Sequence, residues 1–303
     1  AFGVRLRFVE EPEPRGTAGA LKYAEELLED RFLMLNGDVL TDLDVSAQIA
    51  QHERTGAIGT LGLVPVTDPS AYGLVLTKKD GEVTGFLEKP GSDKLVGIDE
   101  YLISAGIYVL EKSVLDRIAP DENVSIETQV WPGLVGESLY GYTSRGTYWM
   151  DIGTPDRYLQ GTGDILLGNV KTAVGERLDA SHQFLAPGAV AEGASVSGAV
   201  IAEEGVQIAA GARVVGPTVL GKGVTVAAGA VVERSVILDG SSIGAGSTVA
   251  DAILSPNVTV GPRTSVQGQS VLGEGVVIGA DCKLDRGIKV FPGTELGDGA
   301  VRF

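Results

Sequence analysis

The stretch that decides the fold is Tyr148-Trp149-Met150-Asp151-Ile152-Gly153-Thr154-Pro155, near the middle of the 303-residue chain. An apolar run ends there in an acid, a glycine and a Thr-Pro pair. Thr154 is a favourable helix N-cap and Pro155 a favourable first helical residue, so a strand is predicted to end at Asp151 just before a helix. Ligands of open α/β sheets bind at such strand ends. Mixed strand and helix patterns precede this stretch, and a short β repeat follows it.

Composition limits the class of protein. A chain of 303 residues predicts two domains, and 44% apolar with 21% charged residues is typical of globular proteins. The single cysteine, Cys282, excludes an intrachain disulfide. The net charge of −16 argues against nucleic acid as a partner, and no run is long enough to span a membrane. We therefore expect a cytoplasmic protein without a nucleic-acid or membrane partner.

The patterns before Asp151 alternate between strands and helices. A helix is expected after the turn 16–20, another over Val45–Thr55, and a third that Ser125 caps and that buries Trp131 and Leu134. Strands are expected at Val4–Val9, 31–35 (buried), Ile58–Val66, Tyr72–Thr77, Val83–Leu87, Tyr101–Leu110, Tyr140–Ser144 and Thr147–Met150.

Two acids follow strands in this pattern. Asp38 comes after a strand in the run Asn36-Gly37-Asp38, and Asp151 ends the strand of the central stretch. One such residue is often only a turn residue. Two of them at the edge of one sheet can hold one Mg²⁺, which favours one or two carboxylates together with phosphate oxygens and water. We expect the two carboxylates to approach each other across a cleft.

Three further runs have both a functional and a structural interpretation. Gly16-Thr17-Ala18-Gly19-Ala20 opens a helix whose backbone N–H groups can face a phosphate or a base, or it is simply a tight turn of small residues. Glu88-Lys89-Pro90 ends a strand and can bind sugar hydroxyls and a phosphate, or it is a solvated loop. Ser104-Ala105-Gly106 leaves room for a group against its strand.

Together these runs resemble the sugar-nucleotide pyrophosphorylases, nucleotidyltransferases that make NDP-sugars. The resemblance covers residues 1 to 168 and is greatest to the mannose-1-phosphate guanylyltransferase and glucose-1-phosphate thymidylyltransferase branches. Five motifs occur in the order of the family: Gly16–Ala20, Leu35–Asp38, Phe86–Pro90, Ser104–Tyr108 and Trp149–Pro155.

The resemblance implies a reaction and a set of site residues. In such enzymes the sugar 1-phosphate attacks the α-phosphorus of an NTP and pyrophosphate leaves, so catalysis rests on alignment and charge neutralisation. It implies that Asp38 and Asp151 hold Mg²⁺ and that Lys89 binds the sugar phosphate. The implied substrate-binding residues are Glu88, Ser104 and Gly106 for the sugar and Gly16, Thr17, Ala18 and Gly19 for the nucleotide. Gly37 and Glu127 are further substrate-binding residues that are assigned to neither substrate.

The chain departs from the family pattern in two places. Ser104-Ala105-Gly106 stands where the family usually has Asn-Ala-Gly, so a hydroxyl replaces an amide at the sugar contact. The opening Gly-rich, Arg-bearing loop of the family, which wraps the triphosphate, has no counterpart before residue 16. We therefore expect the α/β domain to be N-terminally incomplete and these 303 residues alone not to catalyse nucleotidyl transfer.

From residue 190 onward the sequence repeats. The apolar residues of one column recur every 17 or 18 places, a second column lies six places after it, and a third column fills the remaining face. This period indicates three short strands per coil with one inward apolar side chain on each face, and it resembles the left-handed β-helix of hexapeptide-repeat proteins. The columns are Val190, Ile208, Val226, Ile243, Val260, Ile278 and Leu296; Val196, Val214, Val232, Val249, Val266 and Leu284; and Ile201, Leu220, Ile237, Leu254 and Leu272.

The predicted architecture is a Rossmann-like α/β nucleotidyltransferase domain over residues 1–168, a linker over 169–188 and a left-handed parallel β-helix over 189–303. The predicted function is NDP-sugar synthesis from an NTP, with GTP and mannose 1-phosphate favoured. A non-catalytic regulatory or assembly subunit that binds a sugar nucleotide is the alternative. Acyl transfer by the coils is disfavoured because the two histidines, His52 and His182, lie outside them. The β-helix is expected to serve as a scaffold for a homo-oligomer.

Overall fold

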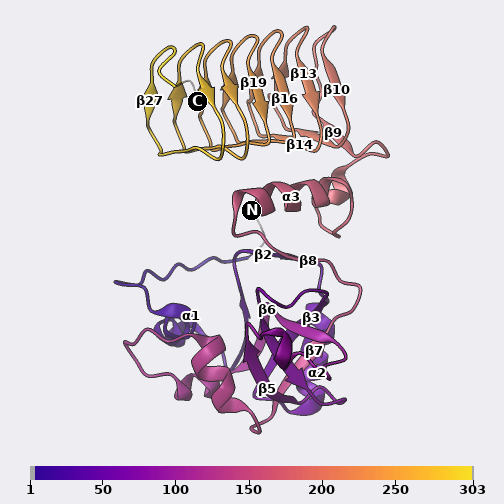
Figure 1. Ribbon diagram of the computed structural model, residues 1–303, viewed down its shortest axis with the longest axis vertical. Coiled ribbons are helices and arrows are strands. Elements are labelled where there is room, and N and C mark those ends of the chain that lie inside the picture. The colour runs from indigo at the N-terminus through magenta and orange to yellow at the C-terminus, as the bar shows by residue number, and fades with distance from the viewer. Residues whose placement is uncertain (1–3, 302–303) are drawn as a thin grey trace. The chain divides into compact units, whose positions relative to one another are not determined.

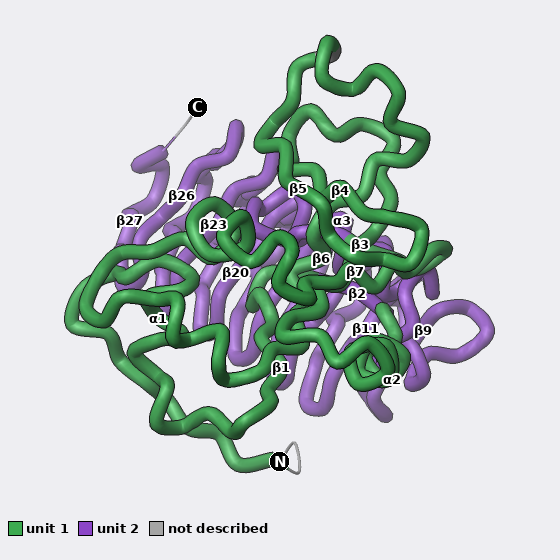
Figure 2. Tube along the Cα trace, turned by 90° about the horizontal axis from the view of Figure 1, so that it is seen from below, with its two compact units in different colours: residues 1–39, 43–149 green, residues 40–42, 150–303 purple. Residues whose placement is uncertain are grey.

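Residues 4–301, apart from the side chain of Ser92, are described by a computed structural model. The chain divides into two compact units: unit 1 contains residues 1–39 and 43–149, and unit 2 contains residues 40–42 and 150–303 (Figure 2). The sequence placed the first domain boundary at residue 168, whereas the boundary between the units lies at 149/150. The helix that follows residue 150 packs with the coils, for a reason given below.

Unit 1 is built on a mixed sheet around one long strand, β6 (Tyr101–Glu111) (Figure 1). The strand order is β5-β4-β6-β3-β7, and β1 pairs with β6 as well. The β3–β7 pair is parallel, and the other pairs within this sheet are antiparallel. The remaining strands are β1 (Arg31–Leu35), β3 (Gly59–Val66), β4 (Gly73–Thr77), β5 (Val83–Glu88) and β7 (Leu139–Thr143). A separate two-stranded sheet, most of which belongs to unit 2, pairs β2 (Val39–Thr41) with β8 (Trp149–Asp151).

Two α-helices and several short helical turns accompany the sheet. The predicted helix over Val45–Thr55 is confirmed as α2, and the Asp44 side chain caps it by accepting from Ala47 N. The helix α1 (Gly16–Tyr23) starts within the predicted turn rather than after it. The short turns are η1 (Glu25–Leu27), η2 (Ser92–Lys94), η3 (Lys112–Arg117), the π-helical turn η4 (Ile126–Val130) and η5 (Trp131–Leu134). Trp131 and Leu134 are buried, as predicted.

Two strand predictions near the start need correction. Val4–Val9 forms no strand, and Phe8 is 91% exposed, because an extended run becomes a strand only when another strand pairs with it. The strand at 31–35 forms, but it is not buried: Leu33 and Leu35 remain exposed. Its apolar composition reflects strand propensity rather than burial within the described residues.

Unit 2 contains a parallel β-solenoid of about six coils, in which three flanks are each made of one strand per coil (Figure 1). Flank 1 is β10 (Ser195–Ser197), β13 (Arg213–Val215), β16 (Val231–Glu233), β19 (Thr248–Ala250), β22 (Ser265–Val266) and β25 (Lys283–Leu284). Flank 2 is β9 (Gln183–Leu185), β11 (Val200–Ala202), β14 (Thr218–Leu220), β17 (Val236–Ile237), β20 (Ile253–Leu254), β23 (Val271–Leu272) and β26 (Lys289–Val290). Flank 3 is β12 (Gln207–Ile208), β15 (Thr225–Val226), β18 (Ser242–Ile243), β21 (Thr259–Val260), β24 (Val277–Ile278) and β27 (Glu295–Leu296).

The repeat register is confirmed on flanks 1 and 3. Val226, Ile243 and Val260 are partners in adjacent coils of flank 3, and each is 1% exposed. On flank 2 the predicted column is wrong at its first member: Leu220 pairs with Ala202, whereas Ile201 pairs with Val219. A shift of one residue turns a strand side chain to the opposite face, so Ile201 points out of the solenoid. The left-handed sense of the coil stays a prediction.

The outward position of Ile201 explains why the next helix belongs to unit 2. Helix α3 (Pro155–Leu166) packs Leu166 against Ala199 and Ile201, a small core outside flank 2. Thr154 occupies the N-cap position, but its side chain makes no capping hydrogen bond there. Between α3 and the coils lies the short turn η6 (Gly175–Arg177).

The predicted linker over 169–188 contains strand β9, which pairs with β11 and so begins the regular solenoid at Gln183. His182 comes directly before this strand, and its Nδ1 lies 3.0 Å from the carbonyl oxygen of Leu166. This contact ties the first coil to the end of α3.

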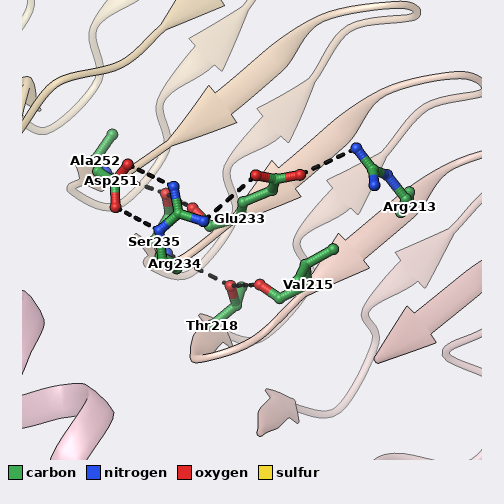
Figure 3. Close-up of polar contacts among 8 residues, drawn as sticks. All are labelled: Arg213, Val215, Thr218, Glu233, Arg234, Ser235, Asp251 and Ala252. Atoms are coloured by element: carbon green, nitrogen blue, oxygen red, sulfur yellow. Dashed lines mark hydrogen bonds and ion pairs between the residues drawn. The ribbon is translucent and has the colours of Figure 1, made fainter. Parts of the chain in front are cut away.

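Ion pairs cross between coils on the outer surface of the solenoid (Figure 3). Arg213 donates to Glu233 one coil along at 3.0 Å. Arg234 contacts Glu233 at 3.5 Å and donates twice to Asp251 in the following coil at 2.8 Å. These side chains are partly exposed, so each pair contributes on the order of 1 kcal/mol or less, and the buried columns carry most of the stability of the solenoid.

Candidate functional site

A cleft of about 270 Å³ in unit 1 brings three of the predicted site residues together: Glu88, Ser104 and Glu127. Its walls are residues of β4, β5, β6 and the turns η4 and η5. Tyr72, Phe86 and Pro132 supply apolar surface beside the two carboxylates. The lining is completed by the buried Trp131 and by Leu61, Gly73, Leu74, Val75, Leu87, Ile103 and Thr128. A carboxylate pair beside aromatic rings suits a ligand that has both hydroxyl groups and apolar faces.

A larger cavity of about 650 Å³ in the same unit contains none of the predicted residues. It is lined by loop residues 78–81 and 97–100 and by Arg145, whose guanidinium is paired with Glu100 at 2.7 Å. Volume alone does not identify a binding site. We prefer the smaller cleft as the candidate site, because the polar groups of Glu88, Ser104 and Glu127 converge in it.

Glu88 and Lys89 lie where β5 ends. Glu88 pairs in register with Gly73, and a Cβ on Gly73 would lie 3.0 Å from Glu88 Oε2, so the glycine leaves space for this carboxylate. Lys89 is exposed and has a φ of 37°, a left-handed conformation that is unusual for a lysine. It has no ion-pair partner within residues 4–301. Such an unfavourable backbone at a strand end is a frequent feature of functional sites.

Ser104 and Gly106 lie on β6 beside an irregularity in its pairing with β3, between Leu61 and Leu63. The Ser104 hydroxyl donates to Tyr108 Oη at 3.0 Å and accepts from Gly106 N at 3.3 Å. Burial raises the pKa of Tyr108 to about 12, so the phenol stays protonated at neutral pH.

Gly106 has a φ of 72°, and Asn36 packs against it so closely that an added Cβ would lie 2.8 Å from Asn36 Nδ2. Asn36 N also donates to the Gly106 carbonyl at 2.8 Å, and Trp149 Nε1 donates to the Ala105 carbonyl at 3.0 Å. Three of the motifs quoted from the sequence therefore meet at this bend of β6.

The segment 16–19 is packed against the loop before η4. Ala18 is fully buried, and the N–H groups of Ala18 and Gly19 donate to the carbonyl of Val124 at 2.9 and 3.3 Å. An added Cβ on Gly19 would lie 2.4 Å from the Glu122 carbonyl oxygen, so glycine is required there for packing. The structural interpretation accounts for these small residues, and only the Thr17 side chain reaches a cleft residue, Glu127.

The two candidate metal ligands belong to different units, each of which is described by itself. In unit 1, Asp38 is exposed in the turn after β1, has no ion-pair partner within residues 4–301, and follows Gly37, around which a Cβ would meet nothing within 4 Å. In unit 2, Asp151 ends β8 as predicted and forms an ion pair with Arg157 of α3. Within residues 4–301 no group of three or more His, Cys, Asp or Glu side chains converges as a metal cage. The approach of the two carboxylates stays a prediction.

Tyr108, Trp131 and Arg157 are near the candidate residues but were not assigned a role from sequence. Tyr108 could have been found, because residues 104 and 108 lie on the same face of a strand. Trp131 was predicted to be buried, but nothing local indicates that it lines a cleft. No sequence motif predicts the ion pair between Arg157 and Asp151.

Comparisons with known proteins agree with this architecture. A family model described as nucleotidyl transferase matches residues 1–167, and one described as GMPPB C-terminal domain matches residues 196–300. A mannose-1-phosphate guanylyltransferase of Mycobacterium tuberculosis is 34% identical over 100% of this chain and 79% of its own length. A mannose-1-phosphate guanyltransferase of Schizosaccharomyces pombe is 36% identical over 94% of this chain and 75% of its own. A mannose-1-phosphate guanylyltransferase catalytic subunit beta of Drosophila melanogaster is 37% identical over 91% of this chain and 71% of its own length.

None of the helices within residues 4–301 has the length and apolar character needed to cross a membrane. The family models cover the α/β unit and most of the solenoid, and relatives more than 30% identical extend over both. The chain belongs to the nucleotidyl transferase family, among the sugar-nucleotide nucleotidyltransferases.

Proposed function

We propose that this protein makes GDP-mannose from GTP and mannose 1-phosphate. A phosphate oxygen of the sugar phosphate attacks the α-phosphorus of GTP, the bond from that phosphorus to the β-bridging oxygen breaks, and pyrophosphate leaves. Family membership supports nucleotidyl transfer. The names of the relatives support the choice of guanine and mannose. No side chain has to form a covalent bond, so alignment of the two substrates is the main task of the protein.

The cleft with Glu88, Ser104 and Glu127 is the single observation that carries this proposal. Two carboxylates can accept hydrogen bonds from sugar hydroxyls, while the half-buried rings of Tyr72 and Phe86 can cover the less polar face of the sugar. Ser104 adds a hydroxyl whose orientation is restrained by its partner Tyr108. We assign the cleft to the mannose ring, together with the backbone of Gly106.

We assign Lys89 to the phosphate of mannose 1-phosphate, because it is an exposed cation without an ion-pair partner within residues 4–301, next to Glu88. Its left-handed backbone turns the chain directly after β5, next to Glu88, which lines the cleft. A lysine binds phosphate as a compact charge, so its removal weakens the ground-state binding of the sugar phosphate.

We assign Asp38 and Asp151 to a divalent metal ion, with Mg²⁺ as the ion. Carboxylate oxygens suit a hard cation, and the exposure of Asp38 is compatible with an ion that keeps several waters and binds substrate phosphates. When bound, Mg²⁺ neutralises charge on the phosphates. Arg157 holds Asp151 by an ion pair at the start of α3, which restricts the position of that carboxylate. We place Gly37 beside the nucleotide, since space is open around it.

We also propose that the protein forms a homo-oligomer through the solenoid. Flank 2 supports this, because its outward-facing Ile253 and Val271 are only half-buried apolar side chains, whereas flank 3 presents Thr225, Ser242 and Thr259. The test is the molar mass in solution by light scattering. A monomer at micromolar concentration would contradict this proposal without affecting the catalytic one.

The catalytic proposal is tested by following pyrophosphate release from the complete protein with Mg²⁺. Each of the four NTPs is combined with mannose 1-phosphate and with glucose 1-phosphate. We expect GTP with mannose 1-phosphate to have the highest kcat/KM. The Glu88→Gln variant should raise KM for mannose 1-phosphate, and Glu100→Gln, which makes the same change at the larger cavity, is the matched control. Tight binding of GDP-mannose without any turnover would instead favour a non-catalytic subunit.

A further inference from the structure

Glu127 is held by two hydroxyl groups from different parts of unit 1. Its Oε2 accepts from Ser125 Oγ at 3.0 Å and from Thr17 Oγ1 at 3.0 Å. Ser125 precedes Glu127 in the same turn, whereas Thr17 lies 110 residues away in helix α1. The carboxylate therefore has one oxygen that is occupied by protein donors and a second oxygen, Oε1, to which no residue of the described part of the chain, 4–301, donates.

The directions of these hydrogen bonds are determined by the backbone. Thr17 Oγ1 accepts from Ile126 N at 2.8 Å, and Ser125 Oγ accepts from Thr128 N at 3.3 Å. Each hydroxyl has a single proton, and since each oxygen already accepts from an N–H group, that proton is available for Glu127. Both hydroxyls thus act as donors to Oε2, and hydrogen bonds to an ionised group are the stronger kind.

Thr17 is itself fixed by close packing. The residues on either side, Gly16 and Gly19, approach the backbone of residues 122–124 so closely that an added Cβ would lie 2.6 Å from Val124 O and 2.4 Å from Glu122 O. Ala18 between them is fully buried. This close packing makes residues 16–19 a rigid support for the exposed side chain of Thr17.

We propose that Thr17 is a positioning residue for the sugar: by holding Glu127 Oε2, it directs Glu127 Oε1 toward a hydroxyl of the bound sugar phosphate. This inference rests on the proposed function, in which the cleft takes the mannose ring. It differs from the expectation that Thr17 lines the nucleotide pocket, and it predicts an effect on one substrate and not on the other.

The test uses the complete protein with Thr17→Val and Thr17→Ser. Valine has nearly the same shape but has no hydroxyl, so Glu127 loses one donor and Ile126 N loses its acceptor. We expect Thr17→Val to raise KM for mannose 1-phosphate about tenfold, as the loss of a hydrogen bond to a charged group does. KM for GTP should be unchanged. Thr17→Ser keeps the hydroxyl and should restore the sugar KM.

Two controls accompany this test. Thr84→Val makes the same change on β5, where the hydroxyl donates to the Leu76 carbonyl at 3.2 Å, and it should leave both KM values unchanged. Tryptophan fluorescence during urea unfolding checks that Thr17→Val is folded, and Thr17→Ala replaces it if it is not. Both tryptophans belong to unit 1, so this signal reports on the unit that carries the substitution.

Titration with mannose 1-phosphate in the absence of GTP separates this inference from the catalytic proposal. If the unsubstituted protein binds the sugar phosphate but does not turn over, Thr17→Val should still weaken binding and Thr17→Ser should not. A rise in KM for GTP alone, or unchanged sugar binding in folded Thr17→Val, would overturn the inference. If the unsubstituted protein does not bind mannose 1-phosphate at all, the proposed function fails, and the inference that rests on it fails as well.

Discussion

The two units of this protein differ in the sequence distance over which their strands pair. In the solenoid each strand pairs with the strand one coil away, and contacts such as Arg234–Asp251 join residues 17 positions apart. In unit 1, β1 pairs with β6, and the contact of Arg31 with Glu111 joins residues 80 positions apart. The first arrangement is periodic and repeats one local rule, whereas the second requires the chain to return to itself after several other elements.

This difference has an energetic consequence. A solenoid is stabilised by its coils and by the contacts between neighbouring coils, so one substitution acts on a repeating array. Unit 1 has core residues that come from distant segments, and Trp131 packs on Tyr108 with ring centroids 5.3 Å apart. Substitutions in the two units should therefore be distinguishable by probes that are specific to each unit.

The largest expected effect comes from Ile243→Asp in the solenoid. Ile243 is 1% exposed between Val226 and Val260, so an aspartate there places an unpaired charge in an apolar column. We expect a loss of more than about 3 kcal/mol. The far-UV circular dichroism transition should move while tryptophan fluorescence, which reports on unit 1, stays in place. Ser242→Asp, one residue earlier and facing outward, is the control, and an equal loss in both variants would refute the register.

The next effect concerns activity and is confined to unit 1. Lys89→Ala removes the ammonium group that we assign to the sugar phosphate, so KM for mannose 1-phosphate should rise roughly 10- to 100-fold while KM for GTP changes little. Lys283→Ala on the outer face of β25 makes the same change in the solenoid and should leave both constants as they are. An unchanged sugar-phosphate KM in Lys89→Ala would remove Lys89 from the site.

A smaller effect is expected from Gly19→Ala. The new Cβ would lie 2.4 Å from Glu122 O, which is backbone and cannot move away without shifting the loop before η4. Overpacking of this kind costs about 1–3 kcal/mol, and the fluorescence transition should move by that amount. Gly37→Ala is the control for stability, because a Cβ on Gly37 meets nothing within 4 Å. Equal unfolding midpoints for Gly19→Ala and Gly37→Ala would show that the contact of the new Cβ with Glu122 O is relieved without loss of stability.

The smallest effect is a pH dependence of unit 1. Burial alone raises the pKa of the Glu111 carboxyl, but hydrogen bonds from His52 at 3.0 Å and from Arg31 at 2.6 Å outweigh burial and lower the pKa below its usual range. A lowered folded-state pKa contributes stability that is present above the unfolded value, near 4.3, and is lost as the pH falls through the folded value.

The unfolding midpoint followed by fluorescence should therefore fall on acidification, and Glu111→Gln should flatten that fall. In the solenoid, the hydrogen bond from Arg177 lowers the pKa of Glu203, so Glu203→Gln should affect only the circular dichroism transition. If the unfolding midpoint of Glu111→Gln depends on pH as that of the unsubstituted protein does, the hydrogen bonds from His52 and Arg31 to Glu111 contribute nothing to the stability of unit 1.

Local patterns were sufficient for many elements. The helix over Val45–Thr55 follows from its N-cap Asp44 and the glycine after its end, and these signals act within a few residues. The solenoid columns follow from a period that every coil repeats, so an error in one coil is visible against the others. Glu88, Ser104 and Glu127 were found from motifs, and the cleft contains all three.

Elsewhere local sequence patterns gave wrong predictions, because the burial of a side chain depends on which distant segment packs against it. Val4–Val9 has the composition of a strand without a partner strand within residues 4–301, and Leu33 and Leu35 are apolar yet exposed. Ile201 and Ala202 are both apolar, but the 18-residue spacing of the neighbouring columns places Ala202, and not Ile201, in line with Leu220. The larger Ile201 points outward, where Leu166 of α3 provides an apolar cover.

By itself, the amino-acid sequence determined the family, the order of the elements, the three inward columns apart from one position, and the candidate residues. These rest on motifs and periods whose physics is local: capping, strand alternation and the burial of one side chain per face. The tertiary structure decided which candidates share a cleft, why Gly16 and Gly19 are glycines, and that Thr17 supports Glu127. Contacts across 110 residues depend on how distant segments pack, and no local pattern records that packing.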